Sequence, residues 1–362
     1  MVVILRLHLA NPYAYLSMGI SNTEYFSLFV TTFVLVGLLT PLARRFALSK
    51  SIVDNPNQGH KTHREPIPYL GGVAIMVGVL VVSYGTSLIA DFTIDTFYLA
   101  SSVLIPALIL GLIGLWDDIK NLSALPRFIA QTVAGVFTAL LLVNTNTSGN
   151  PTGSELIDTI VTIVWIVGIC NSINFFDNLD GGAAGTVAVS SIALAVLALN
   201  GDQSVIAALA TVMAGGTLGF LIWNKSPARI YMGDAGALFL GVVIAVLTIR
   251  LDPTTDQLIG SFATPLLLLA IPILDTSVAV LSRLRRGVSP FQGGRDHLSH
   301  RLIRKGFSRR VTALILWGFS AIFALVAIWI SKPNGEFERW IVYGAGALWA
   351  VLFVFFFVTD DE

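Results

Sequence analysis

Long apolar runs separated by short polar stretches dominate the chain. Each run approaches the roughly 20 residues that a helix needs to cross the ~30 Å hydrocarbon core of a bilayer. There are eleven of them, at residues 25–43, 69–90, 97–116, 128–143, 156–173, 183–199, 204–222, 236–250, 259–281, 311–331 and 339–358. The runs are continuously apolar, and backbone exposed to lipid must satisfy its own hydrogen bonds, so each run is predicted to be helical. The pattern predicts an all-α integral membrane protein with about eleven transmembrane helices, forming a single polytopic domain over residues 1–362.

The composition agrees with this pattern. The 362 residues are 55% hydrophobic and only 12% charged, whereas a soluble domain is about a quarter charged, and the mean hydropathy is +0.78. A net charge of zero argues against a nucleic-acid partner. The one cysteine, Cys170, lies in an apolar run, so no disulfide framework is expected. No cleaved signal peptide is expected either, because the first run ends in Arg44 and Arg45 without a small-residue cleavage pattern.

The basic residues indicate an orientation. All but four of the 22 Lys and Arg residues fall in the loops on one side of the predicted helices; the exceptions are Arg6, Arg250, Lys332 and Arg339. By the positive-inside rule that side is cytoplasmic, with the N-terminus outside and the C-terminus inside, as an odd number of spans requires. The longest cytoplasmic loop, residues 283–310, is too short to fold alone and is expected to form an amphipathic element. Gly215 and Gly219 are expected to make a packing contact between helices.

Five polar stretches carry most of the chemistry on the cytoplasmic side: residues 54–63, 117–127, 174–180, 224–234 and 295–300. Polar residues are costly near a membrane, so their concentration on one face indicates a functional site. Asp117 and Asp118 end one helix as an adjacent pair that suits Mg²⁺. Asn174, Asp177 and Asp180 recur at a spacing of three, which places them on one face of a helix or turn.

The other polar stretches leave alternatives open. Asp234 lies between glycines, where it is either a metal ligand or a helix N-cap, and Asn224 precedes it in a loop suited to a nucleotide or sugar. His297 and His300 lie among arginines that suit phosphate or anionic lipid headgroups. Lys61, in the first loop, either holds an anionic substrate or is one more cytoplasmic basic residue. Together, carboxylates for a metal and basic residues for phosphates favour phosphoryl transfer from a nucleotide-linked donor to a lipid.

The same five stretches, in this order, resemble those of the polyprenyl-phosphate N-acetylhexosamine-1-phosphate transferases. The resemblance rests on Asp117-Asp118, on Asn174-Phe-Phe-Asp-Asn-Leu-Asp-Gly181, on Met232-Gly-Asp-Ala-Gly236 and on the histidine segment. It implies eleven helices in a bacterial plasma (inner) membrane, Mg²⁺ or alternatively Mn²⁺, a UDP-sugar donor, undecaprenyl phosphate as acceptor and UMP as leaving group. Many members of the family are dimers, so a homodimer is a further expectation.

The resemblance also implies roles for single residues. It suggests that Asp117 or Asp118 deprotonates or orients the lipid phosphate, and it leaves open an older alternative with a covalent aspartyl-phosphate. The predicted catalytic residues are Asp117, Asp118, Asp177 and His297. The predicted substrate-binding residues are Lys61, Asn224, Arg295, His300 and Arg301. The predicted metal ligands are Asn174, Asp177, Asp180 and Asp234.

The histidine segment favours one donor. It reads Arg295-Asp-His-Leu-Ser-His-Arg-Leu302, which is similar to the branch of the family that uses UDP-GlcNAc, except that Ser299 replaces a histidine. His297 and His300, and not position 299, are therefore expected to have a function. The expected reaction initiates cell-envelope polysaccharide synthesis, such as that of teichoic acid or lipopolysaccharide. The alternatives are another UDP-N-acetylhexosamine or UDP-MurNAc-pentapeptide as donor, a CDP-alcohol phosphotransferase (disfavoured because Gly185 stands where that motif needs arginine) and a secondary transporter.

Overall fold

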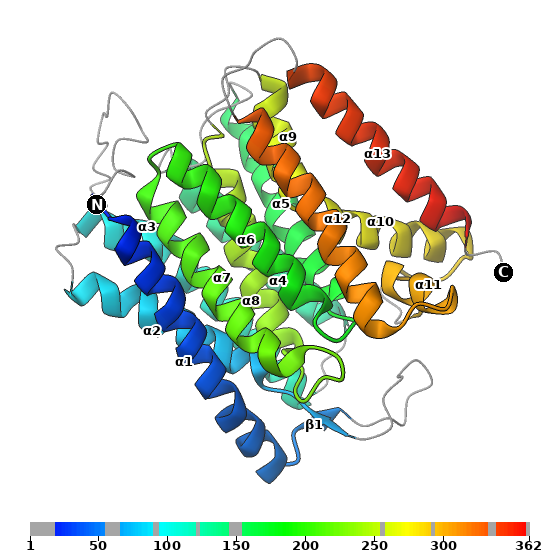
Figure 1. Ribbon diagram of the computed structural model, residues 1–362, viewed down its shortest axis with the longest axis horizontal. Coiled ribbons are helices and arrows are strands. Elements are labelled where there is room, and N and C mark those ends of the chain that lie inside the picture. The colour runs from blue at the N-terminus through cyan, green and yellow to red at the C-terminus, as the bar shows by residue number, and fades with distance from the viewer. Residues whose placement is uncertain are drawn as a thin grey trace.

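A computed structural model describes residues 19–54, 66–89, 94–120, 124–144, 154–253, 258–290, 294–331 and 338–359. These residues form thirteen helices and one antiparallel hairpin, in which Val53 is opposite Pro68 and Asp54 is opposite Ile67 (Figure 1). The elements are α1 (Asn22–Ser49), β1 (Val53–Asp54), β2 (Ile67–Pro68), α2 (Gly71–Ile89), α3 (Ile94–Lys120), α4 (Ala124–Asn144), α5 (Glu155–Phe176), α6 (Gly182–Asn200), α7 (Ser204–Asn224), α8 (Gly233–Arg250), α9 (Leu258–Leu268), α10 (Ala270–Arg285), α11 (Leu298–Arg304), α12 (Arg309–Ile330) and α13 (Glu338–Val358).

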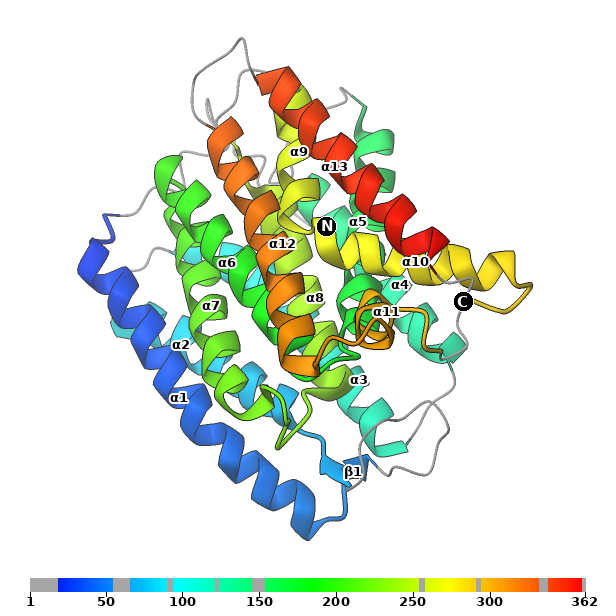
Figure 2. The same ribbon diagram turned by 45° about the vertical axis from the view of Figure 1, so that its right-hand side comes forward.

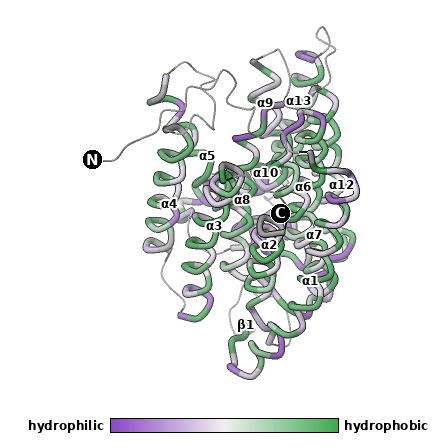
Figure 3. The backbone as a smooth tube through the Cα atoms, turned by 90° about the vertical axis from the view of Figure 1, so that its left-hand side faces the viewer, coloured by the Kyte–Doolittle hydropathy of each residue, from purple (hydrophilic) through white to green (hydrophobic). Residues whose placement is uncertain are grey.

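Each predicted apolar run coincides with helix in the part of the chain that the structure describes. Eight of the helices are long and apolar enough to cross a membrane, and the bent pair α9–α10 makes a ninth; α2 and α4 contain shorter apolar helices. Hydrophobic residues run along the helices, and hydrophilic ones lie mainly toward their ends (Figure 3). The protein is therefore an all-α, multi-pass membrane protein, while the count of eleven spans and the orientation stay predictions.

The predicted run at 259–281 is not one continuous helix. It forms α9 and α10, which meet at Leu269 with a bend of 74°, so that α10 runs across the other helices (Figure 2). Pro272 has no N–H to donate to the carbonyl of Leu268, which interrupts the helical ladder. The hydroxyl of Ser190 in α6 donates to that carbonyl instead, at 2.7 Å. The break thus has a local cause and a partner that stabilises it.

The centre of the fold is α8, nearly all of whose residues are buried. It packs against α2, α3 and α5. The peripheral helices α1 and α13, by contrast, expose large apolar side chains such as Phe26, Leu38, Trp340 and Val351. An exposed apolar surface on both peripheral helices is what contact with lipid tails requires.

Glycines allow several of the helices to approach closely. A Cβ on Gly215 or Gly219 would lie 2.5 or 2.3 Å from carbonyl oxygens of α1, which confirms the predicted packing contact. A Cβ on Gly72 of α2 would lie 2.1 Å from the backbone nitrogen of Gly236. The amide of Gly72 donates to the Met232 carbonyl at 2.9 Å, and that of Tyr231 to the Pro68 carbonyl at 2.9 Å. The hairpin is thereby attached to the loop that leads into α8.

Candidate active site

Asp118 holds the start of α8. Its two carboxylate oxygens accept hydrogen bonds from the backbone amides of Asp234 at 2.9 Å and Ala235 at 3.1 Å. The first amides of a helix have no partner within the helix, and a carboxylate there also meets the positive end of the helix dipole. Gly233 has a φ of +69°, and a Cβ on it would lie 2.4 Å from Asp118 Oδ2. The glycine before Asp234 is therefore needed for this contact.

Asp234 and Asn174 join α8 to the last turn of α5. The side-chain amide of Asn174 donates to Asp234 Oδ1 at 2.8 Å. Asp117 is buried at the end of α3, beside Asp118. The structure thus brings together the first aspartate pair, the central acidic motif and the glycine-flanked aspartate, as the sequence predicts.

Asp177 follows α5 directly, and its carboxylate is held by fewer contacts than those of Asp118, Asp180 and Asp234. Its side chain has no hydrogen-bond partner within the described ranges. Burial and, after it, the negative charges of Asp234, Asp118 and Asp180 together raise the pKa of Asp177 to about 8. We call Asp118, Asp177, Asp180 and Asp234 the acidic group. Its members repel one another, so a cation at this place would be stabilised.

The turn that carries Asp177 and Asp180, residues 177–181, is called here the acidic turn. Asp180 Oδ2 accepts a hydrogen bond from the Ala228 amide at 3.2 Å and forms an ion pair with Arg309 at 3.6 Å. Asn224 Oδ1 accepts from the Gly181 amide at 3.0 Å, and its Nδ2 donates to the Ile230 carbonyl at 2.9 Å. Because Asn224 is buried and bonded at both ends, this arrangement does not support its predicted contact with substrate, which stays a prediction.

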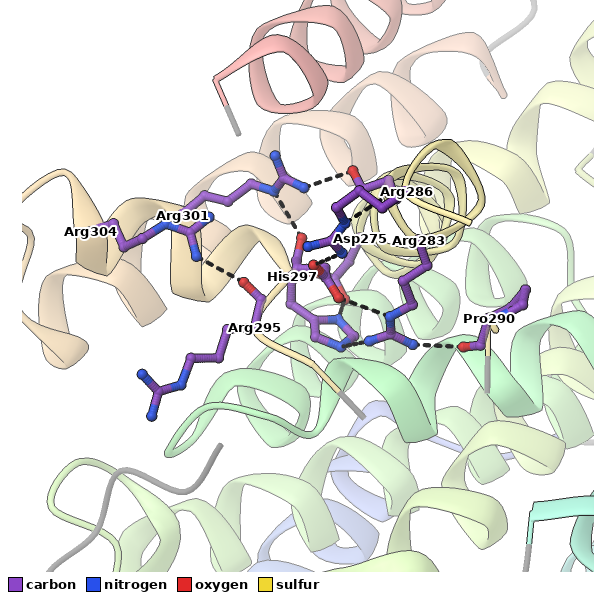
Figure 4. Close-up of polar contacts among 10 residues, drawn as sticks. Asp275, Arg283, Arg286, Pro290, Arg295, His297, Arg301 and Arg304 are labelled. Atoms are coloured by element: carbon purple, nitrogen blue, oxygen red, sulfur yellow. Dashed lines mark hydrogen bonds and ion pairs between the residues drawn. The ribbon is translucent and has the colours of Figure 1, made fainter. Parts of the chain in front are cut away.

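A second group of charged residues lies beside the acidic turn and is shown in Figure 4. We call Asp275, Arg283, Arg286, Asp296 and His297 the basic cluster. Arg283 donates to Asp296 Oδ2 at 2.9 Å, to the Pro290 carbonyl at 2.7 Å and to His297 Nε2 at 3.2 Å. Arg286 also forms an ion pair with Asp296. The arginines of this cluster are thus bonded within the protein.

The same contacts define the state of His297. Arginine can only donate hydrogen bonds, so Nε2 of His297 is the acceptor and Nδ1 carries the proton. Nδ1 donates to Asp275 Oδ2 at 2.7 Å, and Asp275 Oδ1 accepts from the Leu298 amide at 2.7 Å. Asp275, which is fully buried, therefore orients the imidazole. Both ring nitrogens are engaged, and a catalytic role of His297 stays a prediction.

The remaining predicted substrate ligands differ in their surroundings. The buried side chain of Arg301 donates to the Asp296 and Phe356 carbonyls and to Ser282 Oγ, at 2.8, 2.6 and 2.8 Å. This connects α11 to α13 and α10 and does not support substrate binding by Arg301. Burial and, after it, nearby positive charge together lower the pKa of His300 to about 4, so the ring is neutral near pH 7. The side chain of Arg295 is exposed. Lys61 lies outside the described residues.

Sequence reasoning missed several residues of the site. Asp275 and Arg283 were given no part in it, although they hold His297. Arg309, in the last predicted cytoplasmic loop, was counted only for the orientation, yet it pairs with Asp180. The available signal was weak: Asp275 is an acid within an apolar run, and such acids usually have a buried partner.

The donor set suits a hard divalent cation. Carboxylate and amide oxygens are the preferred ligands of Mg²⁺, and the mutual repulsion within the acidic group favours positive charge there. Among the described residues, however, no three His, Cys, Asp or Glu side chains converge as a metal site. The residues therefore fit a magnesium ion that is also held by the phosphates of a substrate, and metal binding stays a prediction.

Comparison with known proteins agrees with this geometry. Residues 100–252 match the family model described as glycosyl transferase family 4. A probable undecaprenyl-phosphate N-acetylglucosaminyl 1-phosphate transferase of Bacillus subtilis is 31% identical over 91% of this chain and 87% of its own. A decaprenyl-phosphate N-acetylglucosaminephosphotransferase of Mycobacterium leprae is 32% identical over 84% of this chain and 83% of its own. A phospho-N-acetylmuramoyl-pentapeptide-transferase of Halalkalibacterium halodurans is 30% identical over 83% of this chain and 94% of its own.

The fold and the site thus define a polytopic membrane protein of the phosphosugar-transferase class. More particularly, the chain belongs to glycosyl transferase family 4, the family that its polar motifs indicate.

Proposed function

We propose that the protein transfers GlcNAc-1-phosphate from UDP-GlcNAc to undecaprenyl phosphate and releases UMP. The observation that carries the proposal is the acidic group, which gathers carboxylates from α3, α8 and the acidic turn at one end of the helix bundle. A nucleoside diphosphate sugar and a lipid phosphate are both anionic, so they need a cation between themselves and these carboxylates. The similarity to N-acetylglucosaminyl 1-phosphate transferases supports the choice of sugar.

The reaction balances without an added base. An oxygen of the lipid phosphate attacks the β-phosphorus of UDP-GlcNAc, the bond from that phosphorus to the bridging oxygen breaks, and UMP leaves with the electron pair. A phosphate monoester has a second pKa near ~6, so the lipid phosphate is already largely ionised at neutral pH. Asp118 is bonded through both oxygens to α8, which suits positioning better than proton transfer.

Asp177 and Asp234, with Asn174 and Asp180 nearby, would hold Mg²⁺, or Mn²⁺ in its place. When bound, the ion neutralises charge on the diphosphate and on the departing UMP. Other residues of the chain position these carboxylates. Asn174 fixes the carboxylate of Asp234, and Arg309 with the Ala228 amide fixes that of Asp180. Asp177 keeps an unbonded carboxylate for the ligand.

The orientation follows from the basic loops. With eleven spans, the N-terminus outside and the C-terminus inside, this end of the bundle would lie at the cytoplasmic face of a bacterial plasma membrane. UDP-sugars are made in the cytoplasm, so this orientation gives the donor direct access. The product, undecaprenyl diphosphate GlcNAc, would start a cell-envelope polysaccharide. A homodimer is proposed because many members of the family are dimers.

UDP-MurNAc-pentapeptide is the second candidate donor, because a pentapeptide transferase is 30% identical to this chain. The test is release of UMP by the purified protein in detergent, with Mg²⁺ and undecaprenyl phosphate, from each donor offered separately. We expect release from UDP-GlcNAc alone. Release from the pentapeptide donor alone would overturn the assignment of the sugar, and release from neither would overturn the proposed reaction.

A further inference from the structure

Side chains from three helices hold the acidic turn in the described part of the chain. Asn224 of α7 accepts a hydrogen bond from the Gly181 amide at 3.0 Å, and Trp317 of α12 donates to the Gly181 carbonyl at 3.2 Å. Both contacts fix the far end of the turn, next to α6. The third contact comes from α11, where the hydroxyl of Ser299 donates to Asn178 Oδ1. It fixes the near end, next to Asp177.

The contact between Ser299 and Asn178 is buried and directional. Ser299 is 1% exposed, so water does not replace its hydrogen bond easily. The other end of the Asn178 amide donates to the Phe175 carbonyl at 2.7 Å. The two bonds fix which way the amide faces, and they close the chain around Asp177 between Phe175 and Asn178.

A second contact links the same segment to the basic cluster. The ring of Phe175 lies 5.7 Å from the guanidinium carbon of Arg283 and 6.3 Å, centroid to centroid, from the ring of His297. Ser299 lies two residues after His297. The segment that precedes the acidic turn is therefore connected to the basic cluster both through Phe175 and through Ser299.

We propose that Ser299 is a positioning residue that acts through Asn178 to hold the near end of the acidic turn in register with the basic cluster. Because Ser299 is buried, this role needs no contact with the substrate. From the sequence alone no function is expected at position 299, because serine stands there in place of a histidine, whereas the hydrogen bond to Asn178 supplies one. The effect of Ser299 on turnover rests on the proposed function, whereas its effect on the order of the turn does not.

The first test measures that order directly. Amide hydrogen exchange of the purified, full-length protein is followed by mass spectrometry over peptides that cover the acidic turn. Ser299→Ala is compared with Ser320→Ala, because Ser320 is also buried and, among the described residues, bonds within its own helix α12, to the Leu316 carbonyl at 2.9 Å. We expect exchange in the turn to become about tenfold faster in Ser299→Ala, as for the loss of one hydrogen bond, and to be unchanged in Ser320→Ala.

The second test measures turnover, once the wild-type protein has been shown to release UMP. Ser299→Ala is expected to lower kcat about tenfold with little change in KM, and Ser299→Thr, which keeps the hydroxyl, is expected to restore it. In an Asn178→Ala background, Ser299→Ala should have almost no further effect, because both substitutions remove the same contact. Ser299→Cys keeps the volume and serves if the alanine variant does not fold.

Unchanged exchange in the turn of Ser299→Ala or Ser299→Cys would overturn the proposal even if the protein had another activity. Faster exchange with an unchanged kcat would show that the contact orders the turn without positioning it for the reaction. Additive losses in the double variant would show that Ser299 does not act through Asn178. An inactive wild type would count against the proposed function alone, since the exchange measurement still decides whether Ser299 holds the turn.

Discussion

The acidic group and the basic cluster lie next to each other but differ in how their charges are compensated. In the basic cluster, Arg283 is bonded to Asp296 and His297, and His297 to Asp275. In the acidic group, Asp177 has no hydrogen-bond partner in the described ranges, and burial, followed by the neighbouring carboxylates, raises its pKa. The chain thus neutralises one region by itself and leaves net negative charge in the other. The difference favours a structural role for the basic cluster and supports the proposal that the acidic group binds a cation.

Removing the unbonded carboxylate should have the largest effect on activity. We expect Asp177→Asn to lower UMP release by at least about 1,000-fold, because a charged group that binds the metal–diphosphate complex contributes several kcal/mol. In the absence of metal, the melting temperature in detergent should stay equal or rise, because the folded wild type must take up a proton on this buried carboxyl group below about pH 8 and the amide need not. Turnover near the wild-type level would contradict the role of Asp177.

Breaking the compensated region should instead lower stability. Asp296→Ala leaves the buried guanidinium of Arg283 without its carboxylate, and removing one member of a buried pair costs about 3 kcal/mol or more. The measurement is thermal unfolding of the purified protein. Arg45→Ala, at an exposed position of α1, is the control and should change stability by less than about 0.5 kcal/mol. Equal melting temperatures for the two variants would refute the distinction between the regions.

The contact of Asp118 with α8 can be isolated by a pair of glycine substitutions. Gly233 and Gly287 both have a φ of +69°, but only at Gly233 would a Cβ meet Asp118, since nothing lies within 4 Å at Gly287. Both alanine variants carry the backbone penalty of about 1–2 kcal/mol. We expect only Gly233→Ala to lower kcat, by about 10- to 100-fold. Similar kcat values in both variants would argue against positioning by Asp118.

The acidic group also predicts a pH dependence of stability. Folded Asp177 keeps its proton up to about pH 8, whereas its ordinary pKa is 3.8. Between these values the folded state binds more protons than the unfolded state, so this group makes the metal-free protein less stable as the pH rises. In a chelating buffer, Asp177→Asn should remove that part of the slope of melting temperature against pH. An unchanged slope would contradict the buried state of the carboxyl group.

His300 predicts a smaller effect of opposite sign. Its pKa falls from 6.5 to about 4 on folding, so the unfolded state takes up more protons in this range. Stability contributed by the neutral ring is present above pH 6.5 and is lost as the pH falls toward 4. His300→Gln should reduce the slope of melting temperature against pH over this window. If the variant and the wild type lose stability equally there, His300 is not the group that titrates.

The sequence predicted the helices well because a bilayer imposes one rule on every span. The run at 259–281 is not one helix, as the pattern predicted, because Pro272 interrupts the helical hydrogen bonds. The hydrogen bond from Ser190 to the Leu268 carbonyl is a tertiary contact that no local pattern reveals. The proximity of Asp118, Asn174 and Asp234 was also predictable, because all three fall in polar stretches on the same predicted side of the membrane. The inward direction of Arg301 and the pairing of Arg283 with His297 were not predictable. A basic residue in a loop has the same sequence pattern whether it faces substrate, lipid or another helix.

The most direct test of the account is the stoichiometry of the reaction. The purified protein is incubated with UDP-GlcNAc labelled in the sugar, with Mg²⁺, and with or without undecaprenyl phosphate; UMP and labelled lipid are then counted. The account predicts one labelled lipid for each UMP and no UMP without the lipid acceptor. UMP released without lipid, or labelled lipid formed without UMP, would contradict a phosphosugar transfer at the acidic group.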